Sequence, residues 1–185
     1  MEAVEPQSQC PQSEIEPSFL LELLSWLGAA GIESWLDGGW GVDALLCAQT
    51  RPHKDVDLIV RVTDIPGLLS SLYAKGFAVR EGQLPHSFVL ADPEGHQIDI
   101  HAVSFDPDGN GVYRMQNGQE WIYPAAGFQG LGAVNGYLVL CLAAEAQVLC
   151  HAHGYIPTEK DLRDMALLAE RFSVELPPQL RFEHG

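Results

Sequence analysis

Basic residues are scarce in this chain of 185 residues, which has 10 Lys and Arg against 25 Asp and Glu. The formal net charge is therefore −15 at pH 7. Because nucleic-acid binding depends on clustered basic side chains that neutralise phosphates, this balance argues against a nucleic-acid surface. A cationic small molecule is a better match, although net charge acts on solubility and steering more than on fold. We expect no nucleic-acid partner.

Cysteines are also few, and long apolar runs are missing. The four cysteines, Cys10, Cys47, Cys141 and Cys150, form no CxxC pair and show no zinc-type spacing with histidine. Three of them lie in apolar sequence, as reduced core thiols do. No stretch reaches the roughly 18 apolar residues of a membrane span, and the first residues lack the basic flank and apolar run of a signal peptide. We therefore expect a cytoplasmic protein with no membrane partner.

Hydrophobic residues make up 46% of the chain, which is enough for one domain with its own core. Residues 1–17 are rich in Glu, Gln, Ser and Pro and predict a flexible tail. Apolar residues at helical spacing predict a helix from Phe19 to Leu27, capped by Ser18. A second helix is expected after Asp64, which would cap it.

Strand patterns and turn residues fill the middle of the chain. We expect three short strands there, at 77–80, 87–91 and 97–103. Asp-Pro-Glu-Gly at 92–95 predicts a hairpin turn between the last two. Residues 105–132 are rich in Gly, Pro and Asn with interleaved aromatics, which indicates short strands and loops that could wall a substrate pocket. A strand is expected at 138–142, followed by two helices, at 145–150 and after Thr158.

A double glycine opens the most informative segment, Trp35 to Val60. Gly38 and Gly39 allow backbone conformations closed to other residues and let the main chain approach a ligand closely. The apolar positions that follow suit a short helix packed on a core. The free N–H groups at the start of such a helix would face an anion such as phosphate.

A pair of aspartates follows in a strand pattern. The period of two places Asp55 and Asp57 on one face, with Val56 and Leu58 on the other. Two carboxylates on one face repel each other unless a cation lies between them. Mg²⁺ is usually held by one or two carboxylates and completed by substrate phosphates and water. A turn and a solvated strand face would explain each motif alone, but their combination favours a phosphate and metal site.

A third carboxylate lies in a later strand. Alternation puts Gln97, Asp99 and His101 on one face, with Ile98 and Ile100 opposite. If this strand neighbours the one that carries the aspartate pair, three carboxylates meet at one site. The third could then be a metal ligand or the base that takes a proton from an acceptor hydroxyl. The spacing leaves these two roles, and a solvated strand face, as alternatives.

Arg51, His53 and Lys54 lie just upstream of the aspartate strand, within reach of a phosphate held by the glycine turn. Cationic donors there would offset triphosphate charge as it shifts toward pyrophosphate; a solvated loop is the alternative. His151 and His153 have the wrong spacing for two ligands on one helical face. We interpret these two histidines as capping or surface residues.

Together these motifs resemble a known family. GGW, then a helix, then TRPHKDVD ahead of a strand is similar to the nucleotidyltransferase superfamily that includes DNA polymerase beta. The branch it most resembles is the lincosamide nucleotidyltransferases, with a more distant likeness to the aminoglycoside 2″-nucleotidyltransferases. The segments that carry the likeness are Leu36–Leu46, Thr50–His53, Asp55–Asp57, Ile98–His101, Asp106–Gly111 and Glu145–His151. The likeness runs from about Phe19 to Phe172, and the chain departs from the family pattern at Cys47 and Ala48.

The resemblance implies an α+β nucleotidyltransferase fold, with a mixed β-sheet flanked by helices and with C-terminal helices. We expect three parts: a flexible tail at 1–17, a nucleotidyltransferase domain at 18–142, and a helical segment at 143–185 packed on that domain. The expected activity is Mg²⁺-dependent transfer of a nucleoside monophosphate onto a hydroxyl of a small molecule, such as a lincosamide or aminoglycoside. The donor would be ATP or another nucleoside triphosphate, and pyrophosphate would leave.

The resemblance also assigns roles to residues. Asp55 and Asp57 would hold Mg²⁺, either one ion or two. Asp99 would act as base, as a metal ligand, or as both. The nucleotide would contact residues of the glycine turn and of the loop after it, namely Gly38, Gly39, Trp40, Arg51, His53 and Lys54.

Two other functions stay open at the level of sequence. One is a non-catalytic nucleotide-binding or antitoxin-like module, which predicts missing carboxylates, whereas all three are present here. The other is a nucleotidyltransferase that acts on a protein hydroxyl. The assembly state is also open, with a homodimer as the alternative to a monomer.

Overall fold

The computed structural model describes residues 13–115, 118–153 and 156–181. Its helices are α1 (Pro17–Ala29), α2 (Gly38–Leu46), α3 (Ile65–Tyr73), α4 (Ala144–His151) and α5 (Glu159–Phe172), with short 3₁₀ helices at Val62–Asp64, Ala125–Gln129 and Pro178–Leu180. Its strands are β1 (Ser34–Asp37), β2 (Asp55–Arg61), β3 (Ala78–Gln83), β4 (Ser87–Ala91), β5 (Gln97–Phe105), β6 (Gly111–Arg114), β7 (Glu120–Tyr123), β8 (Gly130–Val134) and β9 (Tyr137–Cys141). None of the helices in the described part has the length and apolar character needed to cross a membrane.

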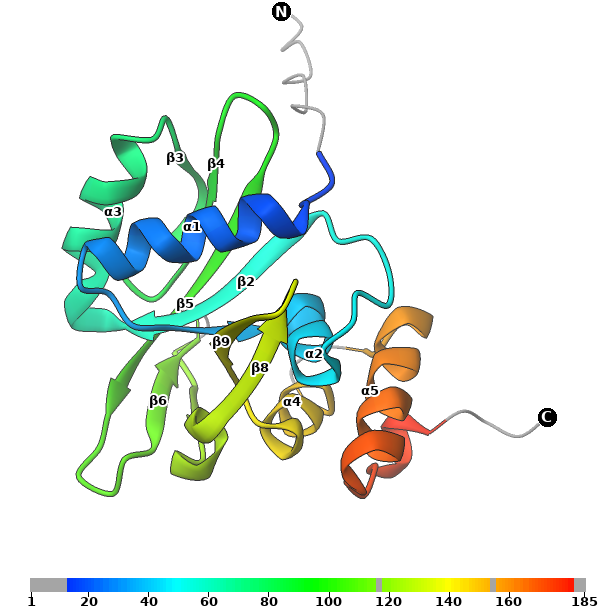
Figure 1. The fold of residues 1–185 in the computed structure, drawn as a ribbon. Coiled ribbons are helices and arrows are strands. Elements are labelled where there is room, and N and C mark those ends of the chain that lie inside the picture. The colour runs from blue at the N-terminus through cyan, green and yellow to red at the C-terminus, as the bar shows by residue number, and fades with distance from the viewer. Residues whose placement is uncertain (1–12, 116–117, 154–155, 182–185) are drawn as a thin grey trace, which may run out of the picture.

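The strands form one mixed sheet in the order β3-β4-β5-β2-β1-β9-β8, and β6 pairs with β5 and β7 at the side (Figure 1). β1 and β2 are antiparallel, whereas β2 and β5 are parallel. This mixed sheet with flanking and C-terminal helices has the α+β architecture that the sequence predicts. In Figure 1, α4 and α5 lie together beside α2, at the lower part of the molecule.

The core lies between α1, α3 and one face of the central strands. Leu20, Leu23 and Leu27 of α1 are fully buried in the same cluster as Val56 and Leu58 of β2. Alternation along β2 and β5 then turns the other side chains, the three aspartates among them, toward the opposite face. The apolar face of these strands therefore fixes which face carries the chemistry.

The first turn of α1 differs from the sequence prediction. The helix begins at Pro17, and Glu16 precedes it, so Ser18 lies within the first turn and does not cap the helix. Proline suits this position because its missing N–H would be unpaired there in any case. Upstream, Ile15 is 1% exposed and its N–H donates to the carbonyl of His53. The described end of the expected tail is thus packed on the domain, and residues 1–12 lie outside the described residues.

The other elements largely follow the sequence patterns. β4 and β5 pair antiparallel around the turn predicted at 92–95, and Thr158 precedes α5 in a capping box with Asp161. The cysteines follow the prediction only in part, because Cys141 is buried and Cys150 half-buried, but Cys47 is exposed. Cys47 lies just after α2, in a left-handed conformation that ends the helix at the surface. Cys10 lies outside the described residues.

Candidate active site

Asp37 ends β1 and caps α2. Its Oδ1 accepts a hydrogen bond of 2.8 Å from the N–H of Gly38, the first residue of the helix. Gly38 has φ +55°, a left-handed conformation that favours glycine, and a β-carbon there would overlap the carboxylate of Asp57. A β-carbon at Gly39 would likewise overlap the ring of His53 and the guanidinium of Arg51. The glycine turn is therefore wedged between the aspartate strand and the loop that precedes it.

Three aspartates form a row across three neighbouring strands. Asp57 of β2 is the register partner of Asp37 on β1 and of Asp99 on β5. Residues in direct register point to the same face of a sheet, and Asp55 joins them two positions along β2. The expectation that β2 and β5 are neighbours is thus confirmed, and Asp37 is an addition that the alternation in β2 and β5 does not reveal.

The carboxylates of this row oppose one another's ionisation. Burial, followed by the charges of Asp57 and Asp55, raises the pKa of Asp99 to about 7. Burial and then Asp57 also raise the pKa of Asp55, while Lys160 lowers it. Carboxylates that raise each other's pKa are a suitable environment for a cation, because a bound cation favours their charged forms.

The donor atoms of this row are spread rather than gathered around one point. Among the described residues, the only three potential metal ligands with donor atoms within 4.8 Å of one another are Asp92, Glu94 and His96. That group belongs to the β4–β5 turn, where Oδ1 of Asp92 accepts the N–H groups of Glu94 and His96. The aspartate row instead suits a hard ion held by one or two carboxylates and completed by phosphates.

His101 extends the row along β5. Its Nε2 lies 3.9 Å from Oδ1 of Asp57, and its Nδ1 lies 3.4 Å from the hydroxyl of Tyr113. Burial lowers the pKa of this imidazole, but the nearby carboxylate of Asp57, with the charges of Asp37 and Asp99, raises it overall. The imidazole therefore links the aspartate row to the aromatic side chains of β6.

Arg51 is held in place by the C-terminal segment. Its Nη2 lies 2.7 Å from Oδ2 of Asp164 on α5, and its Nε bonds to the same carboxylate. Two donors on one carboxylate fix the guanidinium plane. Arg51 lies against Gly39 and also lines the cavity described below, as a phosphate-binding residue would.

His53, Trp40 and Lys54, which the resemblance assigns to nucleotide contacts, lie outside the lining of the cavity described below. His53 is 2% exposed, and its Nε2 lies 2.5 Å from Oδ2 of Asp43, whose other oxygen accepts the N–H and hydroxyl of Thr50. The indole of Trp40 is buried against the His53 ring, with the ring centroids 4.7 Å apart. Both side chains thus support the turn from within the protein, and neither they nor the exposed Lys54 line the cavity.

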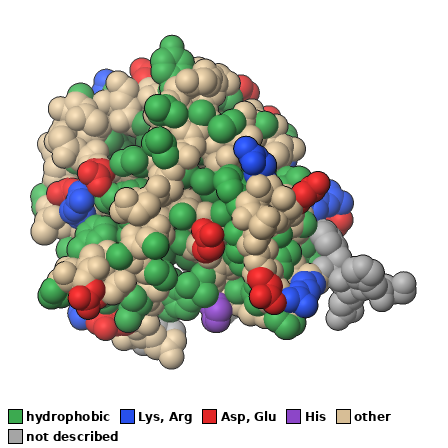
Figure 2. Space-filling view, turned by 60° about the horizontal axis from the view of Figure 1, so that its bottom comes forward, with side chains coloured by type: hydrophobic (Ala, Val, Ile, Leu, Met, Phe, Trp, Pro, Cys, Tyr) green, Lys and Arg blue, Asp and Glu red, His purple; other side chains and the backbone are tan. Residues whose placement is uncertain are grey.

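A cavity of about 890 Å³ opens beside the row. One end holds carboxylates and cations from β2, its preceding loop and α5: Asp55, Asp57, Arg51, Lys160 and Asp161. The other end is walled by Tyr113, Met115, Gln119, Trp121, Tyr123 and Cys150. The expectation that residues 105–132 contribute to a pocket wall agrees with these lining residues. In the space-filling view, hydrophobic side chains cover much of one face of the molecule, with charged side chains scattered among them (Figure 2).

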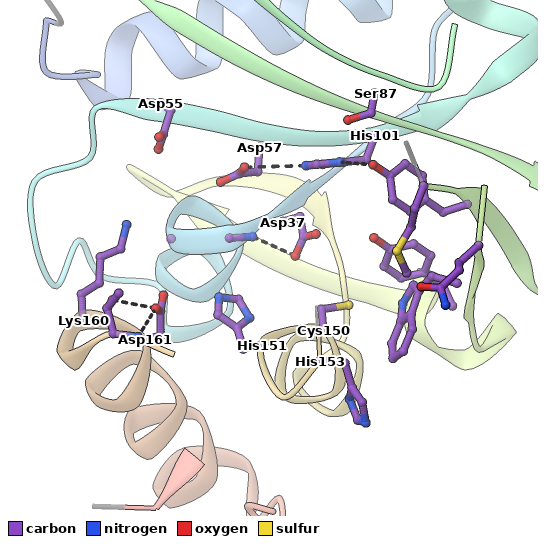
Figure 3. Close-up of a pocket in the computed structure, with 18 of the residues that line it drawn as sticks. Asp37, Asp55, Asp57, Ser87, His101, Cys150, His151, His153, Lys160 and Asp161 are labelled. Atoms are coloured by element: carbon purple, nitrogen blue, oxygen red, sulfur yellow. Dashed lines mark hydrogen bonds and ion pairs between the residues drawn. The ribbon is translucent and has the colours of Figure 1, made fainter. Parts of the chain in front are cut away.

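The C-terminal segment contributes residues to the cavity that no sequence motif indicates. Lys160, in the first turn of α5, extends toward Asp55 (Figure 3). His151 is buried and lines the cavity, so the surface interpretation is wrong for this residue. Its Nδ1 donates to the carbonyl of Gln147, and Nδ1 of His153 donates to that of Leu149, as capping residues do. Only the tertiary packing of α4 and α5 brings these side chains to the site.

Comparisons with known proteins agree with this geometry. The family model for aminoglycoside-2″-adenylyltransferase matches residues 19–168. A lincosamide resistance protein of Staphylococcus haemolyticus is 28% identical over 153 residues, which are 83% of this chain and 92% of that protein. The crystal structure of the lincosamide antibiotic adenylyltransferase LnuA, lincomycin-bound, has a TM-score of 0.75 at 27% identity and covers 84% of this chain and 98% of its own.

A more distant solved structure supports the fold. The crystal structure of ANT(2″)-Ia in complex with adenylyl-2″-tobramycin has a TM-score of 0.67 at 19% identity, over 84% of this chain and 88% of its own. At this identity the likeness extends to the arrangement of the sheet and helices.

Proposed function

Because the chain belongs to the aminoglycoside-2″-adenylyltransferase family and is a nucleotidyltransferase, we propose that it transfers AMP from Mg-ATP to a hydroxyl of a small antibiotic. The acceptor we propose is a lincosamide, with an aminoglycoside as the second choice, since the relative at 27% identity is a lincosamide adenylyltransferase. The observation that carries the proposal is the contact between the glycine turn and Asp57 inside one cavity.

Asp55 and Asp57 would hold Mg²⁺, with Asp99 beside them as a further ligand or as the base. These residues suit a cation because burial and the charges of neighbouring carboxylates raise the pKa values of Asp55 and Asp99. A bound cation would offset that effect. When bound, Mg²⁺ would polarise the phosphate oxygens and offset the charge on the leaving pyrophosphate. Gly38 and Gly39 at the start of α2 line the same cavity, and because the N–H of Gly38 donates to Asp37, the phosphate oxygen would be bound by the N–H groups that follow it.

Arg51 and Lys160 would bind the β- and γ-phosphates. Both line the end of the cavity that contains Asp55, and Arg51 is already oriented by Asp164. Cations at this position stabilise negative charge as it moves from the α-phosphorus toward pyrophosphate. His53 and Asp43 hold the loop that carries Arg51, and so act through that residue.

The acceptor would bind at the aromatic end of the cavity. Tyr113, Trp121 and Tyr123 offer flat apolar faces and hydroxyl groups, a combination that suits the ring and hydroxyls of a sugar-containing drug. The acceptor hydroxyl would then attack the α-phosphorus in line with the leaving group. Positioning and charge account for the catalysis, and no covalent intermediate with the protein is needed.

We propose the same three-part organisation as above, a tail, a domain at 18–142 and a helical segment at 143–185, acting in the cytoplasm. In this scheme the helical segment completes the site with His151, Lys160 and Asp161. The homodimer is a further proposal, and sedimentation equilibrium tests it independently of activity.

A pyrophosphate-release screen tests the function. Mg-ATP and Mg-GTP are each offered with lincosamides, aminoglycosides and simple sugars, and products are analysed by mass spectrometry. We expect pyrophosphate and an adenylylated lincosamide. Release with no antibiotic acceptor but with a nucleotide adduct on protein would replace the proposal by protein modification. No release with any acceptor would contradict it.

A further inference from the structure

Asp37 lies where the two ends of the cavity meet. Figure 3 shows Asp55, Lys160 and Asp161 on one side, Cys150 and His153 on the other, and Asp37 between Asp57 and His151. Asp37 is only 8% exposed, yet it lines the cavity. It is also the register partner of Asp57 on the neighbouring strand. One carboxylate thus borders both the phosphate end and the aromatic end.

The electrostatic couplings agree with this intermediate position. Burial raises the pKa of Asp37, the charge of His151 lowers it, and the charge of Asp57 raises it further. Toward the other end, burial raises the pKa values of Tyr123 and Cys150, and the charge of Asp37 raises each of them further. Asp99, in contrast, does not line the cavity among the described residues.

The orientation of the Asp37 carboxylate is fixed by the fold. Oδ1 accepts the N–H of Gly38, which holds the side chain in its N-cap position. A group whose rotamer is set by the backbone loses little conformational entropy when it binds a substrate. Preorganisation of this kind is what a substrate-orienting residue requires.

We propose that Asp37 is the residue that accepts a hydrogen bond from the attacking hydroxyl of the acceptor and aligns it with the α-phosphorus. Because that hydroxyl has a single hydrogen, Asp99 is then the further metal ligand and not the base. This inference rests on the proposed function, because it assigns the acceptor contact in that same reaction. The aromatic end holds the body of the acceptor, and the hydroxyl that reacts must reach the junction with the triphosphate. Asp37 is the carboxylate at that junction, with Asp57 beside it engaged in metal binding.

Asp37→Asn provides the decisive variant. Asparagine has nearly the same volume and is an equally good N-cap, so its side-chain oxygen still accepts the N–H of Gly38. The variant loses the negative charge of the side chain and the second oxygen that could accept a hydrogen bond from the substrate. It keeps the hydrogen bond that begins the helix. Asp92→Asn is the matched control, because Asp92 is similarly buried, at 7% exposed, and accepts backbone N–H groups in a turn that does not line the cavity.

We expect Asp37→Asn to lower kcat/KM for the acceptor by about 10²-fold or more, as the loss of an oriented catalytic contact does. The Kd for Mg-ATP should stay within about threefold of wild type, because the acceptor contact is not part of the triphosphate site. Asp92→Asn should match wild type in both measurements. An acceptor kcat/KM within threefold of wild type in Asp37→Asn, or an equal loss of Mg-ATP binding, would overturn the proposal.

A binding measurement separates this proposal from the proposed function. Lincomycin is the probe, and its affinity for the protein is measured by equilibrium dialysis with a non-hydrolysable ATP analogue present. We expect at least tenfold weaker binding to Asp37→Asn than to wild type. If wild type releases no pyrophosphate but shows this difference, the transfer reaction is wrong and the Asp37 contact stands. If wild type is active and both variants bind and react alike, the Asp37 assignment alone fails.

Discussion

Gly38 lies directly against the carboxylate of Asp57, so closely that a β-carbon at Gly38 would overlap it. The contact joins the start of α2, which suits a phosphate, to β2, which carries the carboxylates that we propose as metal ligands. Because both elements are buried in one core, neither can shift independently of the other. The proposed phosphate site and the proposed metal site are therefore parts of one rigid arrangement.

Gly38→Ala should disrupt this arrangement. The new methyl group displaces the Asp57 carboxylate and adds the strain of φ +55°. We expect a loss of at least 10²-fold in kcat/KM. Gly31→Ala is the control, because Gly31 has a comparable φ of +73° but open space around its β-carbon position. If the two variants lose similar activity, backbone strain and not contact with Asp57 explains the effect.

Lys160→Met should raise the KM for Mg-ATP by about 10- to 100-fold, the range expected when a hydrogen bond between charged groups is lost. Lys54→Met is the comparison, since both lysines are exposed but only Lys160 lines the cavity. We expect Lys54→Met to have the wild-type KM for Mg-ATP. A larger effect from Lys54 than from Lys160 would contradict the placement of the phosphates.

Asp99→Asn should lower kcat/KM for the acceptor by about 10²-fold or more if Asp99 is the base.

The stability of the metal-free protein should also depend on Asp99, because burial and neighbouring aspartates raise the pKa of this residue in the folded state to about 7. A raised pKa stabilises the folded state below the unfolded value, and that stability is lost as pH rises through about 7. With EDTA, the Tm of wild type should therefore fall from pH 5 to pH 8 more than that of Asp99→Asn. Equal Tm differences at both pH values would refute the raised pKa.

His53→Ala should destabilise the protein by about 1.5–3 kcal/mol, the range for a hydrogen bond to a charged group. The change also removes the ring that packs between Gly39 and Trp40. Urea unfolding gives the free energy directly. A double variant with Asp43→Asn serves as the check, because the two effects should be less than additive if the pair acts as a unit. Strict additivity would show that the 2.5 Å contact between His53 and Asp43 contributes nothing of its own.

The sequence predicts the aspartate face because alternation in a strand is a local rule. Asp55, Asp57 and Asp99 lie on the face opposite the buried Val56 and Ile98, as expected from the period of two. The sequence does not predict that β2 pairs with β5, so it predicts a meeting of the three carboxylates only if these strands are neighbours. This pairing depends on which strands meet in the sheet, and that is a property of the whole fold.

Residues that reach the site through tertiary packing were not predictable. Lys160 has no motif of its own, and only the packing of α5 against the Arg51 loop brings it near Asp55. His53 illustrates the reverse case, because its position upstream of the aspartates suggests a phosphate contact, while its partner Asp43 holds it inside the protein. Burial of a polar side chain depends on its partners, which sequence spacing alone does not identify.

The most direct test of the account compares wild type with Asp57→Asn for pyrophosphate release from Mg-ATP in the presence of a lincosamide. The variant keeps the volume of the side chain and removes a charge that raises the pKa values of Asp55 and Asp99, which offsets the loss of its attraction to His101, so the metal-free protein should remain folded. The account predicts that wild type releases pyrophosphate and that the folded variant does so at less than about one hundredth of that rate. A folded variant that retains more than about a tenth of the wild-type rate would contradict the central claim.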